Sequence, residues 1–442
     1  MIAPEKGLGD IPGVKVVGSE IICGQPRCVR VNLTIEREGR EDKQVAIFLS
    51  MPGGEGYGLI PVAAGAATEN PAARLSDILS GWTEQRRKDG DGGGVIGAVN
   101  GGFFIFIERL WCRASRFYPD HTRVGDAIGL LMTDGVIRFP PLYGRAAFLA
   151  SSDGRYRIAR ADMTHVTIEF RDSKRARTAL NPELINKPDA ERVVCYTPAW
   201  KDKATPRCKG AIEAALIGGA VAATGRNGGL HVPVNGCVVS APEQAWSGLS
   251  ERDVRYVEKV TYVLNEKGRA ELGDARQALE AGPALVENGV PNSIDTAFLV
   301  GQGFVQGAPP FPALNSVLTH YRQLAPRVCI GITGGADVTV ALFEGRRPGE
   351  SEGLILSEAA RFMAAVGCDE AVNLDGGASA ELILHGETLN TLLLGAMEKK
   401  WLDRGLDFLN KYVRSGTLPN AEDLGGAEER TIGTALMIVS RE

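Results

Sequence analysis

The sequence has no strong charge of either sign, few histidines, few aromatic side chains and no long apolar run. Its 49 Lys and Arg residues nearly balance its 54 Asp and Glu residues, which gives a formal net charge of −5. A chain without a global positive field is not expected to bind nucleic acid. No stretch reaches the roughly 18 consecutive apolar residues of a transmembrane helix, so the sequence predicts none.

Metal-binding and targeting signals are also missing. The eight cysteines form no Cys-x-x-Cys pair and the five histidines are scattered, so we predict no metal site and no cofactor. Cys23 and Cys28, and also Cys195 and Cys208, are close enough in sequence to pair. The first residues lack the apolar core of a signal peptide, so either the protein is cytosolic or a leader has been removed.

Glycine, in contrast, is abundant at 55 residues, while aromatic residues make up only 6% of the chain. This balance favours many turns and short strands over a helical bundle. Apolar residues recur at helical spacing in residues 73–86 and 357–366, which predicts two amphipathic helices. We therefore expect an α+β fold, a strand-rich single domain of mixed or antiparallel sheets with several packed helices.

The first motif with chemical content is Asn373-Leu374-Asp375-Gly376-Gly377-Ala378-Ser379, after a short apolar strand. Glycines allow positive φ and close approach of another molecule to the backbone, and successive N–H groups in such a turn can bind an anion. A fixed carboxylate beside them could act as a base or a nucleophile. The alternative is a tight hairpin whose aspartate accepts hydrogen bonds from its own turn.

A second motif, Asn100-Gly101-Gly102-Phe103-Phe104, follows the apolar strand 95–99, and its alternative is a glycine bulge with both Phe side chains in the core. A third, 326–332, places Arg327 at the start of an apolar strand. A guanidinium in a cleft matches phosphate or carboxylate with bidentate geometry, whereas at a strand mouth it would simply be solvated.

The three motifs, taken in their order along the chain, resemble the signature segments of the phosphodiester glycosidases. That family usually has a third glycine where this chain has Ala378, and commonly a small hydroxyl residue where this chain has Glu381. The resemblance runs from about residue 14 to 440 and implies one catalytic domain over 1–442. Its core would be about 14–386 with a closing strand at 429–440, and residues 389–426 would be an insertion containing an amphipathic helix.

The resemblance also implies roles for individual residues. Asp375 would be the catalytic carboxylate, Arg327 would hold a phosphate and Asn100 would orient sugar hydroxyls or polarise water. No acid partner is identified, and Glu381 and Glu287 are the candidates. The other expected substrate-binding residues are Asn373, Gly376, Gly377, Ser379, Gly101, Gly102 and Ser351.

The expected function is hydrolysis of a sugar–phosphodiester bond of the N-acetylglucosamine-1-phosphodiester kind, in carbohydrate or cell-surface glycan metabolism. The expected partner is a carbohydrate phosphodiester or glycan substrate. A glycosidase or lyase acting on a surface polysaccharide such as an exopolysaccharide, and a non-enzymatic glycan-binding protein, are the alternatives. The resemblance implies a periplasmic or secreted protein, although a cytoplasmic one is not excluded.

Overall fold

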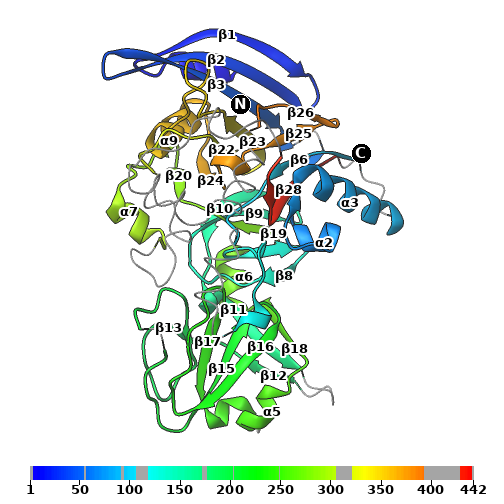
Figure 1. The fold of residues 1–442 in the computed structure, drawn as a ribbon, viewed down its shortest axis with the longest axis vertical. Helices are drawn as coiled ribbons and strands as arrows, with labels where there is room; N and C mark the ends of the chain where they lie inside the picture. The colour runs from blue at the N-terminus through cyan, green and yellow to red at the C-terminus, as the bar shows by residue number, and fades with distance from the viewer. Residues whose placement is uncertain are drawn as a thin grey trace, which may run out of the picture.

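Short antiparallel strands dominate the computed structural model (Figure 1). The structure describes residues 3–53, 56–90, 94–105, 118–171, 177–202, 204–247, 249–304, 321–392 and 429–440.

Four larger sheets carry the fold. Sheet I has the strand order β1 (Val14–Cys23), β2 (Arg27–Arg37), β3 (Arg40–Met51), β23 (Asp337–Phe343), β22 (Arg327–Thr333), β24 (Glu370–Asn373), β20 (Ala284–Glu287) and β21 (Val290–Pro291). Sheet II has the order β26 (Glu387–Thr388), β25 (Leu382–Leu384), β6 (Val95–Asn100), β28 (Thr434–Ser440) and β4 (Tyr57–Ala63).

Sheet III extends from beside sheets I and II to the far end of the elongated molecule, which it forms together with sheet IV (Figure 1). Sheet III runs β10 (Tyr156–Arg160), β9 (Ala146–Ser151), β19 (Ala275–Glu280), β7 (Leu131–Thr133), β8 (Val136–Phe139), β18 (Lys259–Leu264), β11 (Val166–Arg171) and β12 (Arg177–Leu180). Sheet IV runs β13 (Leu184–Ile185), β14 (Val194–Tyr196), β17 (Cys237–Pro242), β15 (Ala211–Ile217) and β16 (Ala220–Arg226), and a small ladder joins β5 (Ala73–Arg74) to β27 (Thr431–Ile432).

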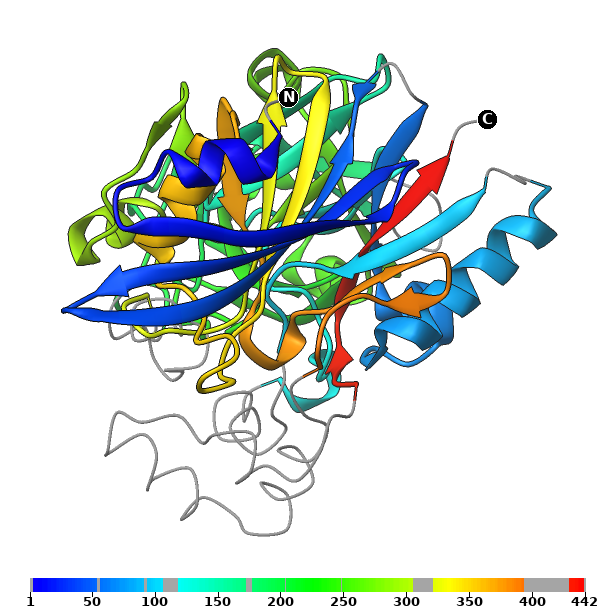
Figure 2. The ribbon, with the colours of Figure 1, turned by 90° about the horizontal axis from the view of Figure 1, so that it is seen from above.

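Helices are few in the described part of the chain. The α-helices are α1 (Pro4–Gly9), α2 (Ala64–Thr68), α3 (Leu75–Lys88), α5 (Glu251–Arg255), α6 (Glu266–Leu272), α7 (Thr296–Gly301) and α9 (Leu356–Ala365). Short 3₁₀ turns are η2 (Pro119–His121), η3 (Met163–His165), η4 (Glu243–Trp246) and η6 (Gly377–Ser379). Seen from above, α3 lies beside sheet II, with β6 and β28 next to it (Figure 2).

The two predicted amphipathic helices are confirmed as α3 and α9. Leu75, Ile78 and Trp82 are the buried face of α3, and α9 stops before Gly367, whose φ of 92° only glycine adopts readily. The strand-rich, antiparallel part of the fold prediction is also confirmed, since β13–β14 is a parallel pair and the other ladders of the described residues are antiparallel. The fold is nevertheless more strand-dominated than the predicted α+β class with several packed helices. The helix expected within 389–426 lies outside the described residues.

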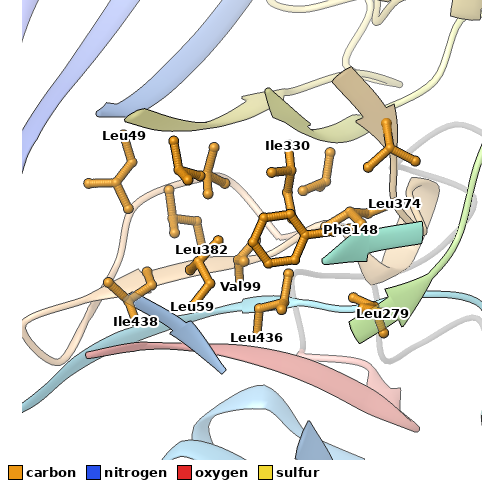
Figure 3. Packing of buried hydrophobic residues seen from close by; sticks show 14 of the residues in the cluster. Leu49, Leu59, Val99, Phe148, Leu279, Ile330, Leu374, Leu382, Leu436 and Ile438 are labelled. Atoms are coloured by element: carbon orange, nitrogen blue, oxygen red, sulfur yellow. The ribbon is translucent and has the colours of Figure 1, made fainter. Parts of the chain in front are cut away.

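One apolar core holds sheets I, II and III together (Figure 3). Ile330 of β22 and Leu49 of β3 come from sheet I, Val99 of β6 comes from sheet II, and Phe148 of β9 comes from sheet III. All four side chains are fully buried. Because this core reaches the last residues of β24 and β6, it fixes the two strand ends that carry the glycine-rich motifs.

The contribution of this core can be measured with Phe148→Ala. Phe148 is 0% exposed and its ring stacks on Tyr156 at 5.6 Å between centroids. Removing a buried phenyl ring costs about 3–5 kcal/mol of the free energy of unfolding, which urea denaturation should show. Val17→Ala, at a side chain 68% exposed, is the control and should change stability by about 0.5 kcal/mol or less. Similar small losses for both variants would contradict this description of the core.

Candidate functional site

The Asn-Leu-Asp-Gly-Gly segment passes from one sheet to another. Its strand β24 lies in sheet I, the chain turns through η6, and the next strand, β25, pairs with β6 in sheet II. The alternative of a tight hairpin is therefore wrong, because the strands on the two sides of the turn are not neighbours. One local feature of that alternative is present, since the Gly376 N–H donates to Asp375 Oδ1 at 2.9 Å.

The two glycine-rich motifs meet at Asn100, whose side chain is fully buried. Its Nδ2 donates to the Asp375 carbonyl oxygen at 2.7 Å, and its Oδ1 accepts from the Glu381 N–H at 3.2 Å. The Asp375 N–H donates in turn to the Gly101 carbonyl oxygen at 3.1 Å. Asn100 therefore positions the backbone on both sides of η6, and its amide is committed to this task.

Asn373, two residues before Asp375, is also buried. Its Nδ2 donates to the carbonyl oxygens of Gly282 and Leu374, at 3.1 and 2.7 Å. Its Oδ1 is buried and has no hydrogen-bond partner among the described residues, which leaves one strong acceptor unused beside the site.

The glycines of the two motifs are required for close packing. A Cβ on Gly376 would lie 2.6 Å from the Pro326 carbonyl oxygen, and Gly377 has a φ of 62°. A Cβ on Gly101 or Gly102 would lie 2.5 Å from Thr434 Oγ1 or the Glu280 carbonyl oxygen. The N–H groups of Gly376 and Gly377 already donate within the chain, to Asp375 Oδ1 and to the Pro326 carbonyl oxygen. This arrangement does not favour the expected donation of these N–H groups to a bound anion.

Asp375 is partly buried between cations and a hydroxyl. Burial raises the pKa of its carboxyl above the ordinary value, while Arg430, the Ser379 hydroxyl, the Gly376 N–H and Arg346 oppose that rise. Arg430 Nη1 also donates to Ser379 Oγ at 3.1 Å, and its guanidinium lies over the Phe104 ring at 5.6 Å. Asp375, Ser379 and two arginines thus form the chemical centre of the site.

Arg327 is 8% exposed and is oriented by backbone acceptors. Its Nε donates to the Leu354 carbonyl oxygen at 2.9 Å and its Nη2 to the Gln323 carbonyl oxygen at 2.8 Å. Burial lowers the pKa of Arg327 to about 10, and the neighbouring Arg346 adds to that effect. Arg327 therefore lies next to the site, with at least two of its donors committed to the fold.

Ser351 supports the same region indirectly. It is fully buried, and its Oγ accepts hydrogen bonds from Gln44 Nε2 and the Val45 N–H, at 3.1 and 3.0 Å. Its backbone pairs with Arg347 in the turn that carries Arg346. Its position fits support of this turn better than direct contact with a substrate.

Arg346 and Arg430 were not identified as site residues from the sequence. Arg346 lies in the turn after β23, which the resemblance to the family included as an arginine-bearing turn without a role for the side chain. Arg430 is 55 positions after Asp375 and comes close only because β27 and β28 return to the site. The position of Arg430 carries no local signal, because its contact depends on the pairing of β28 with β6.

Glu381 is a second carboxyl near the motif. Its side chain is 4% exposed, and Thr388 Oγ1 donates to its Oε1 at 3.4 Å. Burial raises the pKa of Glu381 to about 8, with the nearby Glu429 adding to the rise. Glu429 itself accepts hydrogen bonds from the N–H and hydroxyl of Ser76, in the first turn of α3. Glu287, the other candidate acid, is exposed in the β20–β21 hairpin.

Among the described residues, no group of three or more His, Cys, Asp and Glu side chains is arranged to hold a metal ion. No helix in that part of the chain is long and apolar enough to cross a membrane.

Comparison with known proteins identifies the family. Residues 210–439, just over half of the chain, match the sequence model of the phosphodiester glycosidases. The chain belongs to the phosphodiester glycosidase family. The matched region contains the Arg327 and Asp375 motifs, Arg346 and Arg430, whereas Asn100 comes before it. No curated protein matches the chain.

One solved structure of low sequence identity shares the fold. A hypothetical protein from Synechocystis is 17% identical, with a TM-score of 0.50 over 98% of this chain and 64% of that one. The chain thus spans slightly less than two thirds of that protein. The catalytic domain of zebrafish N-acetylglucosamine-1-phosphodiester alpha-N-acetylglucosaminidase, auto-inhibited by its pro-peptide, is 12% identical, with a TM-score of 0.42 over 99% of this chain and 86% of that one.

The Glu381 carboxyl makes stability depend on pH. A carboxyl whose pKa is raised from 4.5 to about 8 by folding stabilises the folded state at acidic pH, and this contribution is lost as pH rises through 8. Glutamine stays neutral at every pH. The free energy of unfolding of Glu381→Gln, minus that of the native chain, should therefore rise by about 1–3 kcal/mol from pH 5 to pH 9. Denaturant unfolding at both pH values measures the gain.

The matched control is Glu287→Gln, at an exposed carboxyl. It should show the same difference from the native chain at both pH values. A gain for Glu287→Gln equal to that for Glu381→Gln would show that burial of Glu381 is not the cause.

Proposed function

We propose that this protein is a hydrolase that cleaves the bond between a sugar and a phosphodiester. Membership of the phosphodiester glycosidase family supports the reaction class. The observation that carries the proposal is a partly buried carboxyl, Asp375, held by the Asn100 amide and placed among arginines. A carboxylate for the anomeric carbon and positive charge for a phosphate are the two groups that this reaction requires.

The reaction needs one water molecule and no other reactant. The bond between the anomeric carbon and the phosphate oxygen breaks, the phosphate leaves as a phosphomonoester, and the water oxygen joins the anomeric carbon. Asp375 either takes a proton from this water or attacks the anomeric carbon itself, forming a glycosyl–enzyme that water then hydrolyses. A phosphate is a better leaving group than an alcohol, so it needs less help from a general acid than an ordinary glycoside does.

The surrounding residues support this chemistry in different ways. Asn100 is proposed to position Asp375 through its carbonyl oxygen, because both ends of the Asn100 amide are already bonded. Asn373 is retained as a substrate-binding candidate because its Oδ1 is unused by the described residues. The sugar is proposed to be N-acetylglucosamine by analogy with the name of the zebrafish enzyme, and a periplasmic or secreted location is proposed from the family.

A glycosidase acting on a surface polysaccharide is the second candidate, and Glu381 is the observation that favours it. An ordinary glycoside needs a protonated carboxyl to assist its leaving group. Burial keeps the pKa of Glu381 at about 8, so this carboxyl is protonated at neutral pH.

The proposal is tested by Asp375→Asn. If Asp375 is the catalytic carboxylate, release of N-acetylglucosamine from an N-acetylglucosamine-1-phosphodiester should fall by roughly 10³-fold or more, since the amide neither accepts a proton nor attacks carbon. Sugar release is measured by chromatography, and circular dichroism checks that the fold is unchanged.

Asp10→Asn, at an exposed aspartate far along the chain from the motif, is the matched control and should retain full activity. An active native chain whose Asp375→Asn variant keeps more than a tenth of the rate would contradict the assignment of Asp375. A native chain that cleaves only a glycoside with an alcohol leaving group would favour the second candidate.

A further inference from the structure

We infer that Arg346 and Arg430, rather than Arg327, form a phosphate clamp that selects an anionic phosphodiester over a neutral glycoside. This inference rests on the proposed function, which it extends by naming the residues that recognise the anionic part of the substrate. Three features of the molecule support it: the charges around Asp375, the Arg346 Nε, and the turn that carries Arg346.

Two guanidinium groups act on the Asp375 carboxyl. They belong to Arg346 and Arg430, and Arg430 disfavours the charged form of Arg346. Burial and the Arg430 guanidinium together lower the pKa of Arg346 to about 10, and Asp375 only partly compensates. A bound anion would stabilise both guanidinium groups.

Other carboxylates in this region have cations of their own. Glu344 Oε2 accepts from Arg347 Nη1 at 2.7 Å, and Glu358 accepts from Arg37 Nε at 2.8 Å. The nearby Glu381 is protonated at neutral pH, as described above. Within the described part of the chain, these three carboxyls therefore do not neutralise the Arg346 guanidinium.

The Nε of Arg346 could donate a hydrogen bond to a ligand. Its Nε is buried and has no hydrogen-bond partner among the described residues. Buried donors are almost always paired, so one without an acceptor in the protein indicates an acceptor supplied by a ligand. Its guanidinium lies against the glycine turn, because a Cβ on Gly377 would be 3.1 and 3.3 Å from its two terminal nitrogens.

The turn that carries Arg346 is rigid and strained. Arg346 has a φ of 56°, which is uncommon for a residue with a side chain. Its N–H donates to the Glu352 carbonyl oxygen at 3.2 Å, and buried Gln44 ties Glu344, Ser351 and Gly353 together around it. Strain held by such a network is typical of functional positions, and here it aims the guanidinium at the glycine turn beside Asp375.

Arg430 completes the clamp from the position directly before β27. Its Nη1 donates to Ser379 Oγ and its plane is supported by Phe104. Guanidinium groups match phosphate oxygens with paired hydrogen bonds. A phosphate bound by Arg346 and Arg430 would lie beside the Asp375 carboxyl, which would place the anomeric carbon of a sugar phosphodiester within reach of it.

The test is a comparison of two substrates with Arg346→Gln. The substrates are the methyl phosphodiester of N-acetylglucosamine-1-phosphate, which is an anion, and 4-nitrophenyl N-acetylglucosaminide, which is neutral, each as both anomers. Arg346→Gln should raise KM for the phosphodiester roughly 10- to 100-fold and change KM for the neutral glycoside by less than about threefold. The KM of Arg346→Lys for the phosphodiester should lie between those of the native chain and Arg346→Gln. Lysine keeps the positive charge but cannot form the paired hydrogen bonds of a guanidinium group.

Arg347→Gln is the matched control, since Arg347 is in the same turn and its guanidinium binds Glu344 and Glu350 instead. It should retain the native KM for both substrates. Equal losses on both substrates in Arg346→Gln would overturn the clamp and show that Arg346 only orients Asp375. An unchanged phosphodiester KM would overturn it as well.

Inorganic phosphate separates failure of the clamp from failure of the proposed function. It should raise the melting temperature of the native chain and of Arg347→Gln, and should raise that of Arg346→Gln and Arg430→Gln much less. If this pattern holds while the native chain releases no sugar, the clamp stands and the proposed function fails. If phosphate stabilises all four proteins equally, or stabilises none of them, the clamp is wrong.

Discussion

The buried Asn100 amide is the interaction on which the candidate site depends. It bonds the Asp375 carbonyl oxygen with one end and the Glu381 N–H with the other. Asp375 follows a strand of sheet I, and Glu381 precedes a strand of sheet II. The Asn100 side chain therefore joins sheets I and II at the residue that carries the Asp375 carboxyl. An unpaired buried amide would be costly, so this geometry is held firmly as long as the apolar core keeps the sheets together.

The second constraint is electrostatic. The site holds a desolvated carboxyl and two guanidinium groups at the end of a packed core, where water screens their charges less than at the surface. Holding these charged groups together in a partly buried position has a cost, and the proposed anionic ligand would offset part of it. The same burial that raises the pKa of Asp375 lowers that of Arg346. A phosphate-linked sugar offers both the anion and the carbon centre that this arrangement can use.

The sequence predicted the local elements better than the contacts between them. Helix α3 and strand β6 could be predicted because their apolar spacing is a local property. The passage of the Asp375 segment between two sheets could not, because Asp-Gly-Gly has the same local preferences in a hairpin and in a crossing. Arg327 attracted attention as a charge at the start of an apolar strand, yet at least two of its donors bind backbone oxygens. Arg430 carries no local signal, and only the pairing of distant strands brings it to Asp375.

The most direct test of this account is a crystal structure of the Asp375→Asn protein with an N-acetylglucosamine-1-phosphodiester bound. The account predicts the phosphate between the guanidinium groups of Arg346 and Arg430, with the anomeric carbon facing the side chain of residue 375. A phosphate bound at Arg327 with the sugar directed away from residue 375, or a ligand bound elsewhere on the protein, would contradict it.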